Sequence, residues 1–421
     1  MTKVKLFTSA KERAIFYLTL LLFLIIHLYS YYRDYKEFVS LPMFYTKAEV
    51  VSAKTKTKKS RTYRVLKVRF DGKTAYITTT KRANFKNSRI YLKLYPQSIP
   101  ISFIDYLRGF FLYSKILEIY KEPPSIQNSL KEKIKSQHKS EELSSLYGAI
   151  FLATPLNPKV REKMTALGVN HLVALSGFHL GILWGSIFAL FLPIYRVLQR
   201  RFFPWRDRNF DLGILALGIL LFHVIIVGSP ASLVRSYVMM LFAWIALMFW
   251  IELISFEFLS VVVLVILLIN PPFIVNLGFW LSVAGVFYIF LILKHSQNRL
   301  SNLQTALILP ILIHILMIPV AHSIFPEVSI YQWLSPVLSW LFIPFYPLSI
   351  LAHLVGYGDI FDTFLLKLLL FDTTTYQRLL PYWFLGFYLL LSLFAVRFFW
   401  AFLGLLLTAL AGAIYLYLPN L

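Results

Sequence analysis

Two histidines and a serine lie close together at the start of an apolar run. The stretch NHLVALSGFHLG, residues 170–181, contains His171, Ser176 and His179. These residue types serve in nucleophilic catalysis, in metal sites and in hydrogen bonds between packed membrane helices. The chemistry that they supply depends on their partners and on the elements that hold them.

Serine catalysis is the first possibility. Ser176 and His179 are three residues apart, so they can meet on one helical turn. A catalytic triad also needs a carboxylate that orients the histidine. No aspartate or glutamate lies between Glu162 and Asp207, and the sequence ALSGF lacks the G-x-S-x-G elbow. We therefore expect no catalytic residue in this stretch.

A metal site is the second possibility. His171 and His179 are eight residues apart, which is about 12 Å along a helix axis. One zinc ion can bind both only if the helix breaks, for which Gly177 is the candidate, and no third ligand is evident. The chain has no cysteine, so it has no thiolate ligand either. We expect no metal and no cofactor.

Helix packing is the third possibility. Gly177, Gly181 and Gly185 recur every four residues, and this pattern lets a second helix approach closely. Ser176 can then bond to a carbonyl of its own helix or to a neighbouring helix. The residue types alone favour packing, with some lining of a pore.

The composition indicates the elements that must hold this stretch. Of 421 residues, 58% are hydrophobic and 15% are charged, whereas a globular domain has about 25% charged residues. We predict an α-helical polytopic membrane protein with a small extramembrane β-barrel near its N-terminus. The expected parts are an uncleaved anchor helix (1–32), an OB-like basic domain (33–100), interfacial or amphipathic helices with a connector (101–170), and a membrane domain of about ten helices (171–421).

The expected spans of the membrane domain are 172–195, 210–228, 231–251, 256–270, 272–293, 303–325, 331–352, 357–371, 382–396 and 398–418. Several of them are short or contain proline, among them 303–325 and 331–352. Broken helices are tolerated where they line a watery cavity, so these spans indicate either a hydrated interior or kinked packing helices.

Basic residues predict the orientation of the chain. The N-terminus is basic, arginines cluster at 196–208, and Lys294 and Arg299 lie in a later loop. The positive-inside rule places all three regions in the cytoplasm, and residues 33–171 then lie on the outer side of the membrane.

Residues 46–95 form the most basic part of the chain. They contain fifteen basic and two acidic residues, a net charge of +13. Four β-rich runs, with the hairpin sequence Asp71-Gly72 between two of them, suggest an OB-like barrel. Aromatic residues alternate with the basic ones: Tyr63, Phe70, Tyr76, Phe85 and Tyr91.

Basic grooves with aromatic platforms bind single-stranded nucleic acid, and a domain docked on anionic lipid headgroups is the alternative. The candidate DNA-binding residues are Lys58, Lys59, Arg61, Tyr63, Arg64, Lys67, Arg69, Lys81 and Arg82.

Two other segments carry specific expectations. Residues 101–120 place Ile104, Leu107, Phe111 and Ile116 close to one helical face, which predicts an interfacial helix. Arg235 lies a few residues into an apolar helix, where an arginine either contacts passing phosphates or extends to the outer interface.

The stretch around His171 resembles the signature of the ComEC family, inner-membrane channels that pass single-stranded DNA during natural transformation. His171, Ser176, Gly177 and His179 match that signature. Three further blocks follow in the family's order: GSPASLVRSYVMM (228–240) with Arg235, NPPFIVNLGFWLSVAGV (270–286) with Ser282, and FPEVSIYQWLSPVLSWLFIPFYP (325–347) with Ser335 and with Ser339, where many members have asparagine.

The resemblance implies that this chain is an inner-membrane channel that conducts single-stranded DNA from periplasm to cytoplasm, and that the OB-like domain receives the DNA. The implied channel residues are His171, Ser176, Gly177, His179, Gly181, Arg235 and Ser282. The implied partners are single-stranded DNA, membrane lipid, a periplasmic DNA receptor, a cytoplasmic helicase or motor, and DNA-processing proteins, while a homo-oligomer is left open.

The chain departs from many family members in one respect. It has no H-x-H-x-D-H motif of a C-terminal metallo-β-lactamase-like domain, so the resemblance implies the form without that domain and no nuclease activity. It has no P-loop for ATP either, so a motor would be a separate protein.

Two other classes of function compete with the channel. One is a polytopic membrane enzyme that acts on lipid or envelope intermediates, with His171 or His179 as general base. The other is a small-solute transporter, which would have inverted repeats. Neither explains the basic barrel-like domain.

Overall fold

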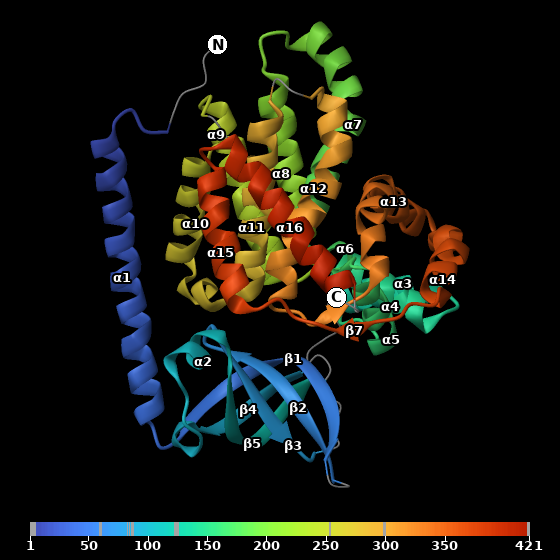
Figure 1. Cartoon of the computed structure of the whole chain (residues 1–421). Coiled ribbons are helices and arrows are strands. Elements are labelled where there is room, and N and C mark those ends of the chain that lie inside the picture. Colours follow the sequence, from blue (N-terminus) through green and yellow to red (C-terminus); the bar gives the residue numbers. More distant parts are fainter. Residues whose placement is uncertain are drawn as a thin grey trace. The chain divides into compact units, whose positions relative to one another are not determined.

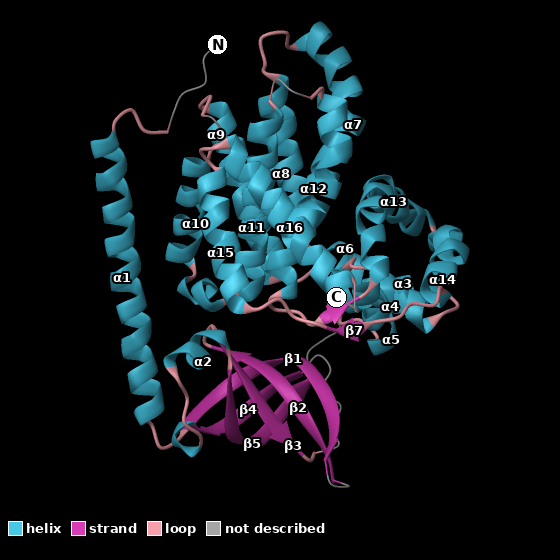
Figure 2. Ribbon diagram, in the orientation of Figure 1, coloured by secondary structure: helices cyan, strands magenta, loops and turns pink. Residues whose placement is uncertain are grey.

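The computed structural model describes residues 6–58, 61–81, 83, 85, 88–121, 126–251, 254–297 and 300–418, without the side chains of residues 58, 61, 231 and 302. The chain divides into two compact units. The barrel unit comprises residues 7–126 and 263–279, and the helical unit contains 127–262 and 280–421. Figures 1 and 2 show their elements, and each unit is described by itself.

The described strands of the barrel unit close into a barrel in the order β1-β2-β3-β5-β4. β3 and β5 run parallel, and the other neighbours run antiparallel. The strands are β1 (Phe44–Lys58), β2 (Arg61–Phe70), β3 (Lys73–Thr79), β4 (Ser88–Tyr95) and β5 (Phe110–Lys121). A closed five-stranded barrel of this kind is OB-like, so the predicted class of this domain is confirmed.

The turn between β2 and β3 forms as the sequence predicts. Asp71 and Gly72 have φ angles of 44° and 72°, and Phe70 pairs with Lys73 across the turn. A type I′ turn needs a positive φ at both central residues, which aspartate and glycine tolerate.

The interfacial helix expected over residues 101–120 is wrong beyond Arg108. Only α2 (Phe103–Arg108) is helical, and β5 follows it. Phe110, Leu112 and Ile116 are buried in the barrel. Without β5, the free edges of β3 and β4 would remain unpaired, so barrel closure outweighs the weak helical periodicity. The barrel therefore extends beyond residue 100.

The long helix α1 (Ala10–Ser40) packs its last turns onto the barrel. Phe38 is buried, with its ring centroid 5.5 Å from that of Phe110 and 5.7 Å from that of Phe44. Tyr35 Oη donates a hydrogen bond to Ile101 O at 2.8 Å. These contacts fix the barrel to the end of an apolar helix, so a span and a basic domain form one structural unit.

The helical unit contains a layer of short helices and the apolar helices of the bundle. The short helices are α3 (Ile126–Ser136), α4 (Glu141–Leu152), α5 (Pro158–Ala166), α6 (Asn170–Val173) and α14 (Asp362–Leu370), with the 3-10 turns η3 (Ile330–Leu334) and η4 (Gly358–Phe361). The apolar helices are α7 (Gly177–Phe202), α8 (Arg208–Ile226), α9 (Ala231–Met248), α10 (Phe256–Ile269), α11 (Leu277–Ser296), α12 (Asn302–His322), α13 (Ser335–Val355), α15 (Tyr382–Ala395) and α16 (Phe399–Tyr417). Residues 263–269 of α10 and 277–279 of α11 belong to the barrel unit. The strands β6 (Glu327–Val328) and β7 (Tyr376–Gln377) pair with each other.

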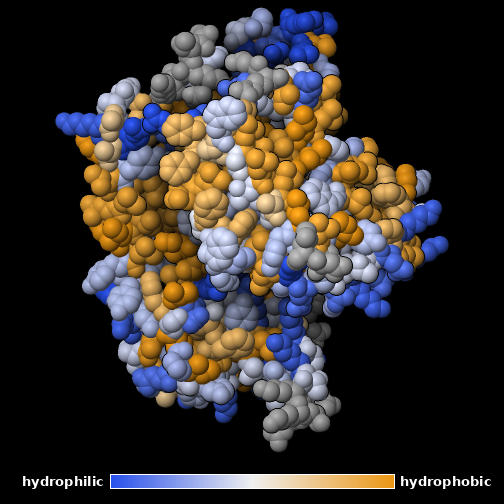
Figure 3. Space-filling model, viewed as in Figure 1, coloured by the Kyte–Doolittle hydropathy of each residue, from blue (hydrophilic) through white to orange (hydrophobic). Residues whose placement is uncertain are grey.

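Among the described residues, seven helices are long and apolar enough to cross a membrane. They are α1, α7, α8, α11, α12, η3 with α13, and α16, and the shorter apolar helices are α9, α10 and α15. The span expected at 357–371 does not form, because η4 and the nine-residue α14 take its place. Large apolar side chains cover much of the visible surface of the helices, as lipid contact requires (Figure 3).

The C-terminal ends of α11 and α15 lie together. Lys294 Nζ donates to Val396 O at 2.7 Å, and a ring nitrogen of His295 lies 2.8 Å from Ala395 O. Arg397 follows directly. The positive-inside rule predicts that this end lies in the cytoplasm.

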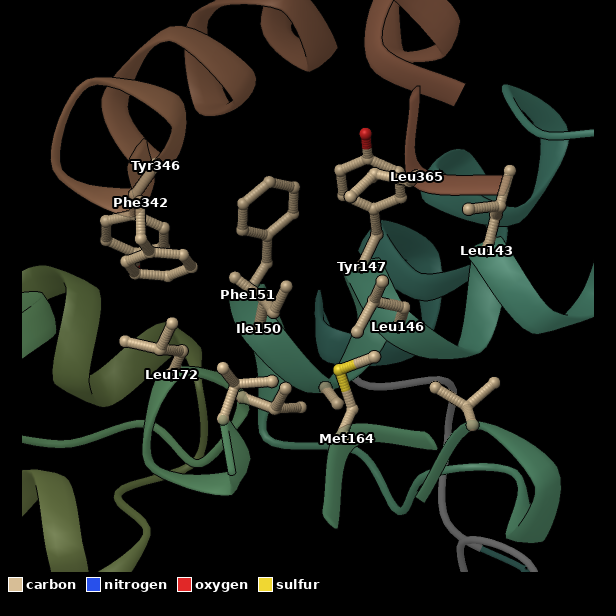
Figure 4. Packing of buried hydrophobic residues seen from close by; sticks show 14 of the residues in the cluster. Leu143, Leu146, Tyr147, Ile150, Phe151, Met164, Leu172, Phe342, Tyr346 and Leu365 are labelled. Carbon is tan, nitrogen blue, oxygen red and sulfur yellow. The ribbon is translucent and has the colours of Figure 1, made fainter. Parts of the chain in front are cut away.

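A second core joins the short helices to α13 and α14. Figure 4 shows Tyr147 and Phe151 of α4 in one buried cluster with Tyr346 of α13 and Leu365 of α14, and the ring centroids of Phe151 and Tyr346 lie 6.1 Å apart. The segment between the barrel and the bundle is therefore folded onto α13.

Phe38 provides a test of how the barrel is held. We expect Phe38→Ala to destabilise the barrel unit by about 3–5 kcal/mol, because it empties a buried aromatic site. Phe23→Ala, on the exposed part of the same helix, is the matched control. Thermal unfolding and limited proteolysis of the full chain in detergent measure the effect, and equal behaviour of the two variants would contradict the packing.

Candidate functional site

The motif around His171 forms two helices separated by a break. α6 ends at Val173, and α7 begins at Gly177. Ser176 is the extended N-cap residue of α7, and its Oγ accepts a hydrogen bond from Phe178 N at 3.3 Å. The break brings His171 and His179 closer than one continuous helix would allow.

His179 completes a reciprocal cap. Its Nδ1 accepts a hydrogen bond from Ser176 N at 3.3 Å, and its Nε2 lies 2.9 Å from Leu172 O, to which it donates. Histidine here takes the place of the glutamate or glutamine in an ordinary capping box. Both ring nitrogens of this fully buried, neutral side chain are engaged. This arrangement favours a structural role over that of a general base.

His171 connects the motif to α13. Its Nε2 lies 3.2 Å from Ser339 Oγ, which donates to Ser335 O at 2.7 Å. Ser335 Oγ in turn donates to Gly168 O at 3.0 Å. Sequence blocks more than 160 residues apart therefore share one hydrogen-bond network.

The ring of His171 lies in an unusual environment. The protein around it lowers the pKa of His171 to about 4, because burial disfavours the charged ring. The residue nevertheless keeps exposed surface.

The glycines of the motif do not act as a group. A methyl group on Gly177 would lie 3.3 Å from Ser236 Oγ, so α9 approaches α7 closely there. At Gly181 and Gly185 a methyl group would meet no described atom within 4 Å. The glycine-repeat packing expected at these two positions is therefore wrong, and both glycines are exposed.

Other polar residues lie at the same end of the helical unit. Arg235 is buried on the first turns of α9, directly before Ser236. His179 lies within electrostatic range of both His171 and His223. We call His171, Ser176, His179, Arg235, Ser236 and Ser339 the polar end of the bundle. Ser282 lies half-buried on α11, and no hydrogen bond found in the described part of the chain joins it to the polar end.

The polar end has no arrangement typical of a metal centre. Within the described residues, no group of three or more histidine, aspartate or glutamate side chains is placed to hold a metal ion. The neutral serines and histidines and one arginine would instead offer hydrogen bonds and positive charge to an anionic ligand.

The outer surface of the barrel carries the second candidate site. The row Ser52, Lys67, Tyr76 and Phe111 crosses β1, β2, β3 and β5 in register. Tyr76 and Phe111 stack with ring centroids 5.2 Å apart, and Phe111 is half exposed. A stacked aromatic pair therefore lies beside a lysine on an open sheet surface.

Basic side chains cluster next to this pair. Burial lowers the pKa of Lys67, and the neighbouring charges of Arg69 and Lys54 lower it further. Glu49 pairs with Arg69 in the strand register and provides an opposing charge. We call Lys54, Lys67, Arg69, Tyr76 and Phe111 the basic face.

The other predicted DNA-binding residues lie in different settings. Arg64 donates a hydrogen bond to Ala83 O, and Lys81 Nζ donates to Ile116 O at 2.9 Å. Both side chains therefore stabilise the barrel. Tyr63 pairs with Lys56 across β1 and β2. Lys59 and Arg82 fall outside the described residues, as do the side chains of Lys58 and Arg61.

Two of the predicted aromatic platforms are wrong. Phe70 and Phe85 are buried in the barrel core and cannot stack with a base. Phe111 was not predicted, because its segment was assigned to a helix. The alternation of buried and exposed residues along 110–116 is the signal that identifies its outward direction.

Comparison with known proteins identifies the family. A model described as Competence protein matches residues 153–420, more than half of the chain. The chain belongs to the competence protein family. Membership, together with the apolar helices, makes it a multi-pass membrane protein with a role in natural transformation.

Two relatives of this competence protein share part of its length. It is 28% identical over 199 residues to ComE operon protein 3 of Bacillus subtilis (strain 168), covering 46% of this chain and 24% of that one. It is 29% identical over 192 residues to an uncharacterized protein of Aquifex aeolicus (strain VF5), covering 43% and 41%. The matched region is thus less than half of each relative. No solved structure matches the chain significantly.

The reciprocal cap gives a testable stability effect. We expect His179→Ala to lower the free energy of unfolding by about 1 kcal/mol for the lost cap alone. His179→Gln should lose less, because its amide oxygen can accept the Ser176 N–H. Thermal unfolding of the full chain in detergent measures both, with His314→Ala on α12 as a control. Indistinguishable alanine and glutamine variants would show that the cap is not what His179 contributes.

Proposed function

We propose that this competence protein conducts a single strand of DNA across the inner membrane, from periplasm to cytoplasm, during natural transformation. In this proposal the barrel receives the strand and the helical unit passes it. The observation that carries the proposal is the basic face, a cluster of cations beside a stacked aromatic pair on a membrane-anchored barrel.

The electrostatics of the basic face support this role. Burial is the main cause of the lowered pKa of Lys67, and the charges of Arg69 and Lys54 lower it further, so holding these three cations close together costs free energy. A polyanion would remove that repulsion. Phosphates would contact the cations while bases stack on Tyr76 and Phe111, which is the recognition mode of sequence-tolerant single-strand binding.

The polar end supports passage of a polyanion. No carboxylate occurs in residues 163–206, 212–251 or 328–358, which include α7, α9 and α13. The N-termini of these three helices meet at the polar end, and helix N-termini carry partial positive charge. The polar groups there would attract phosphate without the repulsion that acidic side chains would add.

The membrane-enzyme alternative has less support. It needs His171 or His179 as a general base, but His179 is committed to its cap and His171 to Ser339. The proposed partners are therefore those of a channel: a periplasmic DNA receptor, a cytoplasmic motor that pulls the strand, and DNA-processing proteins.

Binding of DNA by the barrel can be measured directly. We expect the full chain in nanodiscs to bind a fluorescent oligothymidylate, and the triple variant Lys54→Gln, Lys67→Gln, Arg69→Gln to bind it more weakly. Because each phosphate contact contributes about 0.7 to the salt slope for a single strand, loss of three contacts should reduce the slope by about 2. Fluorescence anisotropy at several salt concentrations measures both quantities.

Matched variants separate nucleic acid from the lipid alternative. The triple change Lys47→Gln, Lys93→Gln, Lys115→Gln removes the same charge from β1, β4 and β5 and should affect binding less. Replacing Tyr76 and Phe111 by leucine should weaken oligothymidylate binding at an unchanged salt slope, by about 1–3 kcal/mol for each lost stack. Equal weakening by both triple variants, or binding to anionic vesicles but not to oligothymidylate, would contradict the proposal.

A further inference from the structure

A buried cluster of ionisable side chains lies away from both candidate sites. His138 follows α3, His353 lies near the end of α13, and Asp362 begins α14. His138 Nδ1 lies 3.0 Å from each carboxylate oxygen of Asp362, and His138 Nε2 lies 3.0 Å from His353 Nε2. His353 Nδ1 lies 2.7 Å from Ser349 O.

Counting hydrogens shows what this geometry requires. His353 Nδ1 must carry hydrogen, because it faces a carbonyl oxygen that can only accept. The 3.0 Å contact between the two Nε2 atoms needs a hydrogen on one of them. The contact of His138 Nδ1 with Asp362 needs a second hydrogen, which the pair shares. The cluster thus holds one proton more than two neutral imidazoles and a carboxylate.

The surroundings locate that proton on His138. Both carboxylate oxygens of Asp362 are equally close to its Nδ1, as in a charge-assisted contact. The ring of Tyr147 stacks on the imidazole with centroids 4.3 Å apart and planes 8° apart. An aromatic face stabilises a cation, so Tyr147 favours the imidazolium.

The charged and titratable groups around the cluster come from each neighbouring element. α4 contributes Tyr147, α13 contributes His353, and α14 contributes Asp362. Asp359 of η4 acts electrostatically on Tyr147 and adds a second negative charge. Lys139, the next residue after His138, is exposed.

We propose that His138, His353 and Asp362 form a proton-binding site that clasps the connector before the membrane helices onto α13 and α14. Gln137 strengthens the same junction, because its Nε2 donates to His353 O at 3.1 Å and its Oε1 accepts from Gly358 N at 2.9 Å. When the proton leaves, two hydrogens remain for three contacts that each need one, so one contact is lost and the clasp opens. The proposal does not depend on the DNA-channel function.

Nitrogen NMR of the histidines tests the proton directly. The chain has nine histidines, and an ordinary histidine loses its proton near pH 6.5. We expect the full chain in lipid bilayers, labelled with ¹⁵N-histidine, to show one doubly protonated imidazole at pH 8. The signal should vanish in His138→Gln and Asp362→Asn and persist in the control His295→Gln.

The wild-type spectrum decides the question even if a variant fails to fold. Nine neutral imidazoles at pH 8 would overturn the proposal, and so would a signal that survives in His138→Gln. Gly358→Ala is an additional probe, because its methyl group would lie 2.4 Å from Gln137 Oε1 and 2.8 Å from His353 Nε2. We expect it to remove the signal, whereas Gly386→Ala, where a methyl group meets no described atom within 4 Å, should retain it.

Discussion

A bilayer offers no water to satisfy polar groups, so each polar side chain at membrane depth needs a partner within the protein. The family motif meets this constraint by ending one helix and starting another. His179 and Ser176 satisfy each other and the first backbone groups of α7, and His171 satisfies Ser339 of α13. The residues that look catalytic in the sequence are mainly those that cap the break between α6 and α7 and connect it to α13.

The same constraint explains why charge gathers on the barrel. The apolar helices carry few ionisable groups, whereas residues 46–95 have a net charge of +13. Barrel closure by β5 satisfies every strand edge, which leaves the outer surface for cations and exposed rings. The packing of Phe38 against the barrel ties this charged surface to a membrane anchor. A cationic surface and an apolar helix therefore belong to one structural unit.

Local signals in the sequence predicted local structure well. The turn at Asp71-Gly72, most of the apolar spans and the class of the barrel follow from short patterns. Features that depend on partners far away in the sequence could not be predicted from short patterns. Residues 110–121 become a strand because β3 and β4 need a neighbour. His138 meets His353 and Asp362, which lie more than 200 residues later in the sequence. The glycine repeat gave a wrong prediction at Gly181 and Gly185, because glycines four residues apart allow a second helix to approach but do not show that one does.

Fate-tracking of fluorescent double-stranded DNA in cells that encode this protein tests the central claim most directly. In cells that lack the gene, the account predicts that DNA enters the periplasm and never reaches the cytoplasm. Cells with Arg235→Gln at the polar end should show the same block, with the protein present in the membrane at normal levels. DNA that reaches the cytoplasm normally without the gene would show that this chain is not the channel.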